Sequence, residues 1–376
     1  MSLTKTAHRF KKGAKILLIV VSVYYLMILI IIPKTRDFIL DLLVDRNPPN
    51  PAFGILDPLK FYPTPISDPQ PIYVLNTKNG RLPAGMPKKM NVFKFKGIQY
   101  SYLSGKGSQT DATLLGFKES ELVSDLKGEE FKWQSLESGG ILTINTKTQA
   151  LHLETDMYGK AAEYVKGNIN NKIAIDKSIE ILRNLNRIDD FYLRVEPIVT
   201  LAVFSGNSLY PTKVGTDAQL ARVDLFRKIK DVPVYGPDPK VGLLSVILRN
   251  PIEGTHGSSP YNYPVVDIRY WAIDEGKTDA SYPIITVKEA WQNVSQGKGI
   301  VANVTPKNSN RFVLVDKVRL ERVLISDIYL AFYETPEFQR YLQPIWVFSG
   351  KYTTTGTEGG EVTIYYPALT TEYTRH

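Results

Sequence analysis

The longest apolar run in the chain lies near its start, where Ile16 to Ile32 reads ILLIVVSVYYLMILIII without a charged residue. At 1.5 Å per residue, a helix over this run is about 25 Å long, close to the length that spans a bilayer. A cleaved signal peptide is the alternative, but the run is longer than a signal core and no small-x-small cleavage site follows it. The pattern predicts an uncleaved transmembrane anchor over residues 16–33.

Charges around this run predict its orientation. Five basic residues and no acid lie in residues 1–15, whereas Lys34 and Arg36 are partly offset by Asp37 and Asp41. The positive-inside rule then predicts a basic cytoplasmic tail over residues 1–15, a single pass through the cell membrane, and a C-terminal ectodomain outside. Subtracting these five charges from the net +8 leaves +3 for the rest of the chain, so the basicity predicts no nucleic-acid partner.

Proline dominates the segment after the apolar run. Eight of the 24 prolines fall between residues 46 and 71. Because proline fixes its own torsion and disfavours helix in the residue before it, this stretch is expected to be extended. The pattern predicts a juxtamembrane segment and proline-rich stalk over residues 34–71; the alternative is that this segment packs along the folded part.

Alternating apolar and polar positions then predict a small, strand-rich α+β extension over residues 72–138. Within it, residues 91–103 read as a strand and residues 111–126 as a short helix. The glycine-containing SGKGSQTD at Ser104 matches no phosphate-binding motif and is expected to close a hairpin.

Two later stretches share one pattern, NKIAIDKSIEIL from Asn171 and YPIITVKEAWQNV from Tyr282. When they are aligned, their apolar positions coincide and predict a strand-like start followed by one buried helix face. Asp176 is a candidate cap of the first helix. Thr286, with Glu289 three residues later, predicts a capping box at the second.

Strand patterns flank both stretches in the same order, a hairpin before the helix and three strands after it. The sequence therefore predicts an α+β ectodomain made of two duplicated units, residues 139–239 and 240–376. In each unit, one helix is expected to pack on an antiparallel sheet.

The composition excludes several kinds of functional site. There is no cysteine, which excludes disulfides and thiolate metal sites. Of the four histidines, only His152 and His256 lie in the expected folded part, without metal-ligand spacing, so no metal site, cofactor or Ser-His-Asp triad is predicted. His152 is expected to face outward from a strand, and His256 to lie in a solvated turn.

One stretch resembles the motif of serine-lysine acyl-enzymes, because Ser295 and Lys298 match S-x-x-K. The partner motifs of those enzymes do not occur, and Gly297 and Gly299 indicate that a helix ends here. No catalytic residue is therefore predicted.

Tyrosine is abundant, with 22 in the chain and eleven from Tyr261 onward. Tyrosine suits binding of sugars and peptides, and it is also common on sheet surfaces. Residues that flank a long loop form the candidate ligand or partner surface: Tyr261, Tyr263, Tyr270 and Trp271.

The anchor, the helix expected from Thr286 and the strand carrying Gln343, Pro344, Ile345 and Trp346 resemble extracytoplasmic regulators of the YycH and YycI type, and more loosely PepSY domains. The resemblance covers the pattern of residues 95–370 and includes no diagnostic motif. Proteins of that family are not enzymes and adjust a membrane sensor kinase. The resemblance implies a non-catalytic accessory protein and identifies no kinase partner for this chain. The proline-rich stalk departs from the family pattern.

These observations lead to one main hypothesis and two alternatives. The main hypothesis is a non-catalytic, membrane-anchored extracytoplasmic protein that binds and regulates or scaffolds another cell-envelope protein. One alternative is a binding module for a cell-wall polymer or peptide. The other is an unrecognised envelope hydrolase centred on Ser295 and Lys298.

Overall fold

The computed structural model describes residues 15, 17–26, 48–67, 70–96, 104–125, 128–167, 169–250, 263–269, 272–274, 280–313 and 317–375. Contacts within the chain define two units, Met1–Asn50 and Pro51–His376.

In the first unit, residues 17–26 are helical and exposed. Over the part of the chain that the structure describes, no helix has both the length and the apolar character to cross a membrane. This finding contradicts the predicted single-pass anchor at residues 16–33, the signal anchor and the membrane localisation with an outer ectodomain. The tail over residues 1–14 lies outside the described residues.

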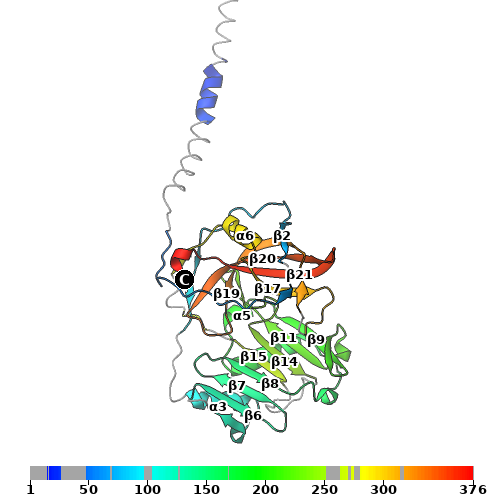
Figure 1. Cartoon of the computed structure of the whole chain (residues 1–376). Helices are drawn as coiled ribbons and strands as arrows, with labels where there is room; N and C mark the ends of the chain where they lie inside the picture. Colours follow the sequence, from blue (N-terminus) through cyan, green and yellow to red (C-terminus); the bar gives the residue numbers. More distant parts are fainter. Residues whose placement is uncertain are drawn as a thin grey trace, which may run out of the picture. The chain divides into compact units, whose positions relative to one another are not determined.

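The second unit is mostly β. Strands make up 39% and helices 20% of the described residues, so the predicted α+β class is wrong. Its larger sheet has nine strands and only antiparallel pairs (Figure 1). In sheet order the strands are β10 (Ser208–Pro211), β9 (Ile198–Ser205), β11 (Leu220–Leu225), β14 (Leu244–Arg249), β15 (Val265–Ile268), β8 (Leu151–Glu154), β7 (Ile141–Asn145), β6 (Glu130–Gln134) and β5 (Leu122–Ser124).

The second sheet has eight strands and mixed direction. Its main path is β12 (Arg227–Ile229), β13 (Val232–Tyr235), β19 (Arg322–Tyr333), β20 (Tyr341–Thr354), β21 (Thr357–Pro367) and β17 (Ile300–Pro306). Two further strands join it, β2 (Ile72–Leu75) beside β19 and β4 (Phe93–Lys94) beside β20. Two small sheets pair β1 (Ile66–Ser67) with β18 (Val318–Arg319), and β3 (Lys89–Asn91) with β16 (Ser281–Pro283).

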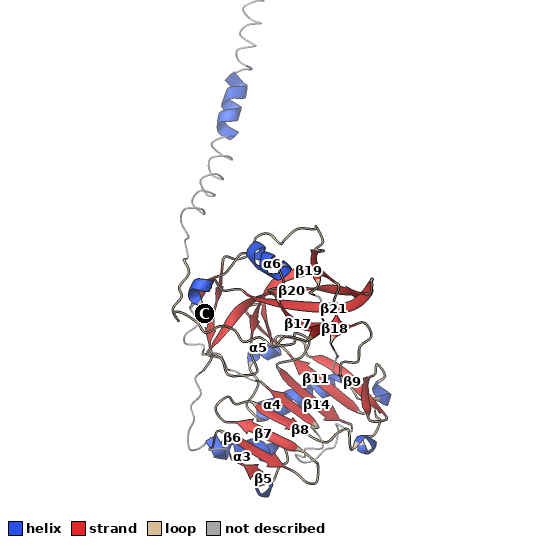
Figure 2. Ribbon diagram, in the orientation of Figure 1, coloured by secondary structure: helices blue, strands red, loops and turns tan. Residues whose placement is uncertain are grey.

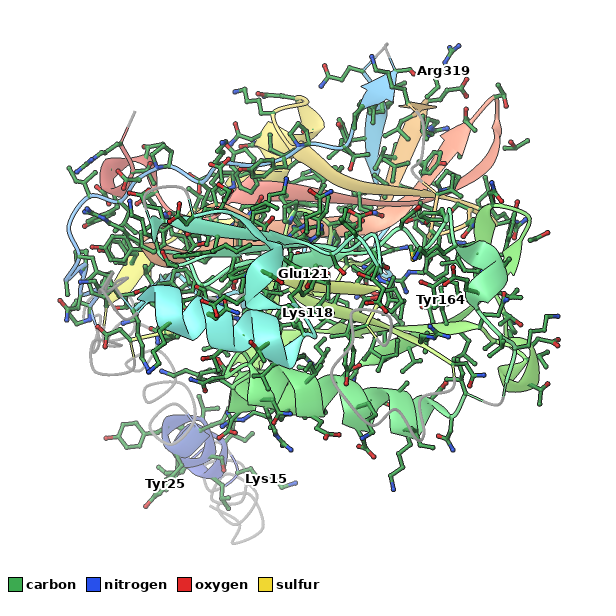
Figure 3. The ribbon with its side chains drawn as sticks, turned by 90° about the horizontal axis from the view of Figure 1, so that it is seen from below. Lys15, Tyr25, Lys118, Glu121, Tyr164 and Arg319 are labelled. Carbon is green, nitrogen blue, oxygen red and sulfur yellow. The ribbon has the colours of Figure 1, made fainter. Side chains whose placement is uncertain are left out.

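The helices cover apolar sheet faces. α3 (Ser104–Leu114) and α4 (Asn171–Asn184) contribute to the core of the nine-stranded sheet, and Figure 3 shows them as neighbouring helices. In Figure 2, α4 lies behind the strands, consistent with its contacts to β9, β11 and β14. α5 (Asp190–Leu193) contacts β12, and α6 (Val287–Ser295) contacts β2 and β21. Short 3₁₀ turns lie at Glu119–Glu121, Ala161–Glu163, Gly215–Asp217 and Thr371–Tyr373.

The two helix-on-sheet units are not duplicates. β14 and β15, expected in the second unit, pair with β11 and β8 in the nine-stranded sheet. β13, expected in the first unit, instead pairs in parallel with β19. Pairing between strands far apart in sequence therefore overrides the repeated local pattern, and the duplicated architecture is wrong.

The similar stretches also adopt different local structures. Ile173 and Ile175 lie inside α4, which is capped by the Asn170 side chain rather than by Asp176. Ile285, in contrast, precedes α6 and donates its N–H to the Ala368 carbonyl. The predicted strand-like start therefore holds only for the second stretch.

The predicted capping box of α6 is confirmed. Thr286 Oγ1 accepts from the Glu289 N–H at 3.2 Å, and Glu289 Oε2 accepts from the Thr286 N–H at 2.8 Å. Earlier in the chain, the Ser104 segment forms α3 rather than a hairpin turn. The helix expected over residues 111–126 is therefore misplaced; Lys118 and Glu121, labelled in Figure 3, form a separate turn after α3.

Candidate functional site

A polar groove is the strongest candidate site among the described residues. It has a volume of 400 Å³ and lies between residues 57–60 and the connection from β19 to β20. Its lining combines charged groups, amides and aromatic rings. The lining residues are Asp57, Pro58, Leu59, Lys60, Thr335, Glu337, Phe338, Gln339, Arg340, Tyr341 and Gln343.

One wall of the groove belongs to residues 56–64, which we call the strap. Pro58 and Pro63 disfavour helix in the strap, so its backbone groups bond to other segments of the folded unit instead. The Leu56 N–H donates to the Tyr373 carbonyl at 2.8 Å, and the Thr64 N–H donates to the Val301 carbonyl at 2.8 Å. The proline-rich segment therefore packs along the folded unit, as the alternative prediction had it.

The opposite wall is the turn between β19 and β20, which is fixed by one amide side chain. Gln339 Oε1 accepts from the Thr335 N–H at 3.1 Å. Its Nε2 donates to the Tyr333 carbonyl at 2.9 Å and the Tyr341 carbonyl at 3.1 Å. Glu337 and Arg340 are thus held on a shaped turn rather than on a free loop.

An ion pair crosses the groove from wall to wall. Lys60 Nζ lies 2.7 Å from Glu337 Oε1, and both side chains are 61% exposed. The hydrogen bond from Lys60 lowers the pKa of Glu337, and the same bond raises the pKa of Lys60. An exposed pair of this kind contributes little stability, so its groups can exchange partners at low cost.

A second, more apolar groove of 280 Å³ lies against the same part of the strap. It shares Pro58, Leu59 and Gln343 with the polar groove. Its remaining lining is Phe61, Lys298, Ile300, Pro344, Tyr366, Pro367, Leu369 and Thr374.

A row of polar residues on the nine-stranded sheet is a different kind of site. Asp224, Ser245, Asp267 and His152 face one another across β11, β14, β15 and β8. Asp224 is fully buried and accepts from Arg222 at 2.9 Å, Arg311 at 2.7 Å and the Gly242 N–H at 3.1 Å. Its lone pairs are satisfied by these groups, which indicates a structural role.

His152 is the member of this row that is exposed to solvent. Its Nδ1 lies 3.6 Å from Asp267 Oδ1, its Nε2 lies 3.6 Å from Glu154 Oε2, and its side chain is 53% exposed. The predicted outward orientation is thus confirmed. Asp267, and then Glu154, raise the pKa of His152. Burial alone would raise the pKa of Asp267, but His152 and Arg269 lower it overall.

A second buried ion pair joins Arg227 to Glu334, and both side chains are fully buried. The Arg227 guanidinium lies 5.9 Å from the Phe95 ring centroid and 5.6 Å from that of Tyr192. Burial raises the pKa of Glu334 to about 7, against the opposing effect of Arg227.

The candidate surface predicted from tyrosine is only partly described. Tyr261, Tyr270 and Trp271 lie outside the described residues, as does His256. Tyr263 is half-buried and packs against the core of the nine-stranded sheet, where burial, and then the charge of Glu180, raise the pKa of its hydroxyl. It does not line the polar groove.

The serine-lysine pattern lies at the end of α6, where Gly297 has a φ of 78° and the predicted helix end is confirmed. Ser295 Oγ donates to the Gln292 carbonyl at 2.9 Å, and Lys298 Nζ donates to Asn293 Oδ1 at 3.4 Å. Each group therefore bonds to its own helix. Across the described residues, no three metal-ligating side chains gather in one place.

Sequence patterns alone did not indicate the polar groove. Its walls are 277 residues apart at Lys60 and Glu337, and local patterns do not report such a distance. The available signals were the dense prolines of residues 46–71 and the stretch at Gln343 and Pro344.

Comparisons with known proteins leave the family open. No family model matches the sequence, and no curated protein matches it. Among solved structures, the chain is similar to an uncharacterized protein from Eubacterium rectale ATCC 33656, at 14% identity and a TM-score of 0.40, over 75% of this chain and 85% of that chain. A TM-score this low carries no argument. The resemblance to YycH and YycI-type regulators stays a prediction.

Proposed function

We propose that this chain is a non-catalytic binding protein that regulates or scaffolds another protein, and that the partner binds in the polar groove. The observation that carries the proposal is a concave surface that combines an exposed ion pair with a rigid turn. Lys60 and Glu337 offer both signs of charge within 2.7 Å of each other, so a partner can replace either one.

The lining of the groove also supports binding over catalysis. The lining residues that could act as a nucleophile or base are already engaged. Lys60 pairs with Glu337, Asp57 pairs with Arg375, and Thr335 Oγ1 donates to the Glu337 carbonyl. Ser295 lies on α6 with its hydroxyl bonded to a helix carbonyl, outside the lining of both grooves described above.

Binding of a wall polymer is the second candidate, and one observation bears on it. Sugar recognition uses the open face of an aromatic ring. Tyr341 lines the groove, but its ring stacks on Phe53 with centroids 4.9 Å apart. One face of Tyr341 is therefore occupied, which favours a protein partner.

A photocrosslinking experiment tests the proposal. A photoreactive amino acid replaces Arg340 in the groove of the full chain, and Lys351 on β20 serves as the control position. A protein captured only from position 340 is then purified and titrated against the wild-type chain and Glu337→Lys. The proposal expects Glu337→Lys to weaken binding by about tenfold or more. Equal capture from both positions, or unchanged affinity, would contradict it.

A further inference from the structure

The strap is held in the way that a bound peptide is held. Its backbone bonds to the folded unit at both ends, through Leu56 and Thr64. Between them, Gln343 Nε2 donates to the Asp57 carbonyl at 2.8 Å, and the Tyr333 hydroxyl donates to the Lys60 carbonyl at 3.3 Å. These hydrogen bonds are made to backbone groups of the strap, so they would also form with another extended chain of different side chains.

Three apolar side chains anchor the strap. Leu56 is fully buried in the core that also includes residues of α6. Leu59 and Phe61 pack on a separate cluster on the eight-stranded sheet, where the Phe61 ring lies 4.7 Å from Tyr333. Leu59 and Phe61 are two residues apart, so an extended chain presents both on one side. Leu56, three residues before Leu59, packs in a different cluster.

Open space borders the middle of the strap. The grooves of 400 Å³ and 280 Å³ both use Pro58 and Leu59 as lining. A ligand in the position of the strap would therefore have room for larger side chains at these places. Glu337 and Lys298, which do not belong to the strap, would provide charges for it to contact.

We propose that the surface beneath the strap is a peptide-binding site, which the strap fills within its own chain. Its ligand in trans is an extended segment of a partner protein with apolar residues spaced as Leu56, Leu59 and Phe61. This inference rests on the proposed function, because it specifies how the partner of the polar groove is recognised.

The strap competes with any such ligand. A tethered segment acts at an effective concentration on the order of millimolar, so a free peptide of the same sequence binds the wild-type chain weakly. Weakening the anchors of the strap removes this competition without changing the surface beneath it.

A peptide titration provides the test. The probe is a fluorescent peptide of residues 51–66, added to the full wild-type chain and to Leu59→Ser/Phe61→Ser. The double variant is expected to bind the probe about tenfold tighter than the wild type. A probe with serine at both anchor positions serves as the control. Equal binding of the two probes to the double variant would overturn the proposal.

Hydrogen exchange in the wild-type chain keeps the proposal testable if the double variant does not fold. The amides of Leu56 and Thr64 are expected to exchange at least about 100-fold faster than that of Phe348 in β20, because the strap opens locally. Exchange at the rate of Phe348 would mean that the strap leaves only on global unfolding, which contradicts the proposal. If only these tests fail while Glu337→Lys still weakens partner binding, the groove function stands without the strap mechanism.

Discussion

The Asp224 network and the polar groove contain similar chemical groups in opposite surroundings. In each, a carboxylate lies 2.7 Å from a cation, Arg311 in the network and Lys60 in the groove. Asp224 is fully buried, whereas Lys60 and Glu337 are 61% exposed. A buried carboxylate depends on its partners for solvation, while an exposed one also has water. The comparison distinguishes a buried charge that stabilises the fold, Asp224, from the exposed charges of Lys60 and Glu337, which we propose bind a partner.

The largest expected effect on stability is at a buried ion pair, Arg227 with Glu334. Arg227→Ala leaves Glu334 without its cation in a fully buried site and should cost about 3 to 5 kcal/mol in the free energy of unfolding. Urea unfolding measures this loss. The matched double variant Arg227→Met/Glu334→Gln should recover most of it, because no buried charge remains; an equal loss in both would contradict the account.

The pH dependence of stability tests the same pair. An acid with a pKa raised from 4.5 to about 7 binds its proton more tightly in the folded state. Its contribution is therefore greatest below pH 4.5 and falls by on the order of 3 kcal/mol as pH rises to about 7. Unfolding of wild type and Glu334→Gln across this window measures the difference. A wild-type curve that does not fall relative to the variant would refute the assignment.

A smaller effect is expected at Arg311. Arg311→Ala removes one donor to Asp224, but Arg222 and the Gly242 N–H remain, so the loss should be about 1 to 2 kcal/mol. Arg319→Ala is the control, since Arg319 is 57% exposed and 3.9 Å from Glu321. Its expected cost is below about 0.5 kcal/mol. Equal melting points for the two variants would remove the distinction between buried and exposed sites.

His152 lies between these extremes. Its pKa is raised, so the stability from its charged form is present below the unfolded pKa of about 6.5 and lost as pH rises through the folded value. Titration by NMR should give a pKa above 6.5, and Asp267→Asn should lower it. A pKa unaffected by Asp267→Asn would contradict the 3.6 Å contact between His152 Nδ1 and Asp267 Oδ1.

The smallest change in stability is expected in the groove. Glu337→Lys should leave the melting temperature close to that of the wild type, because the pair is exposed to solvent. Thermal unfolding checks this, with Glu358→Lys as a control because Glu358 forms a similar exposed pair with Lys351 at 3.1 Å. A clearly lower melting temperature for Glu337→Lys than for Glu358→Lys would mean that Glu337 has a structural role.

Local features were predictable from the sequence, whereas the pairing of strands was not. The Thr286 capping box, the end of α6 and the outward His152 depend on neighbours within a few residues. The β8 to β15 pair, in contrast, joins Leu153 to Val266, and no local periodicity specifies that partner. The repeated helix pattern therefore led to a false duplication.

The candidate site was hidden for the same reason. The prolines of residues 46–71 led to two predicted outcomes, a stalk and packing along the folded part, and the strap packs along the folded unit. Which surface it covers depends on residues such as Tyr333 and Gln343, almost 300 positions away. The number of tyrosines did not indicate the groove, because many tyrosines such as Tyr365 are buried in the core.

The most direct test of the central claim is the affinity of the crosslinked partner for two charge-reversal variants of the full chain. Glu337→Lys lies in the groove and Glu358→Lys lies outside it. The account predicts that Glu337→Lys weakens binding by about tenfold or more while Glu358→Lys leaves it unchanged. Equal affinities for the two variants would contradict the assignment of the polar groove as the binding site.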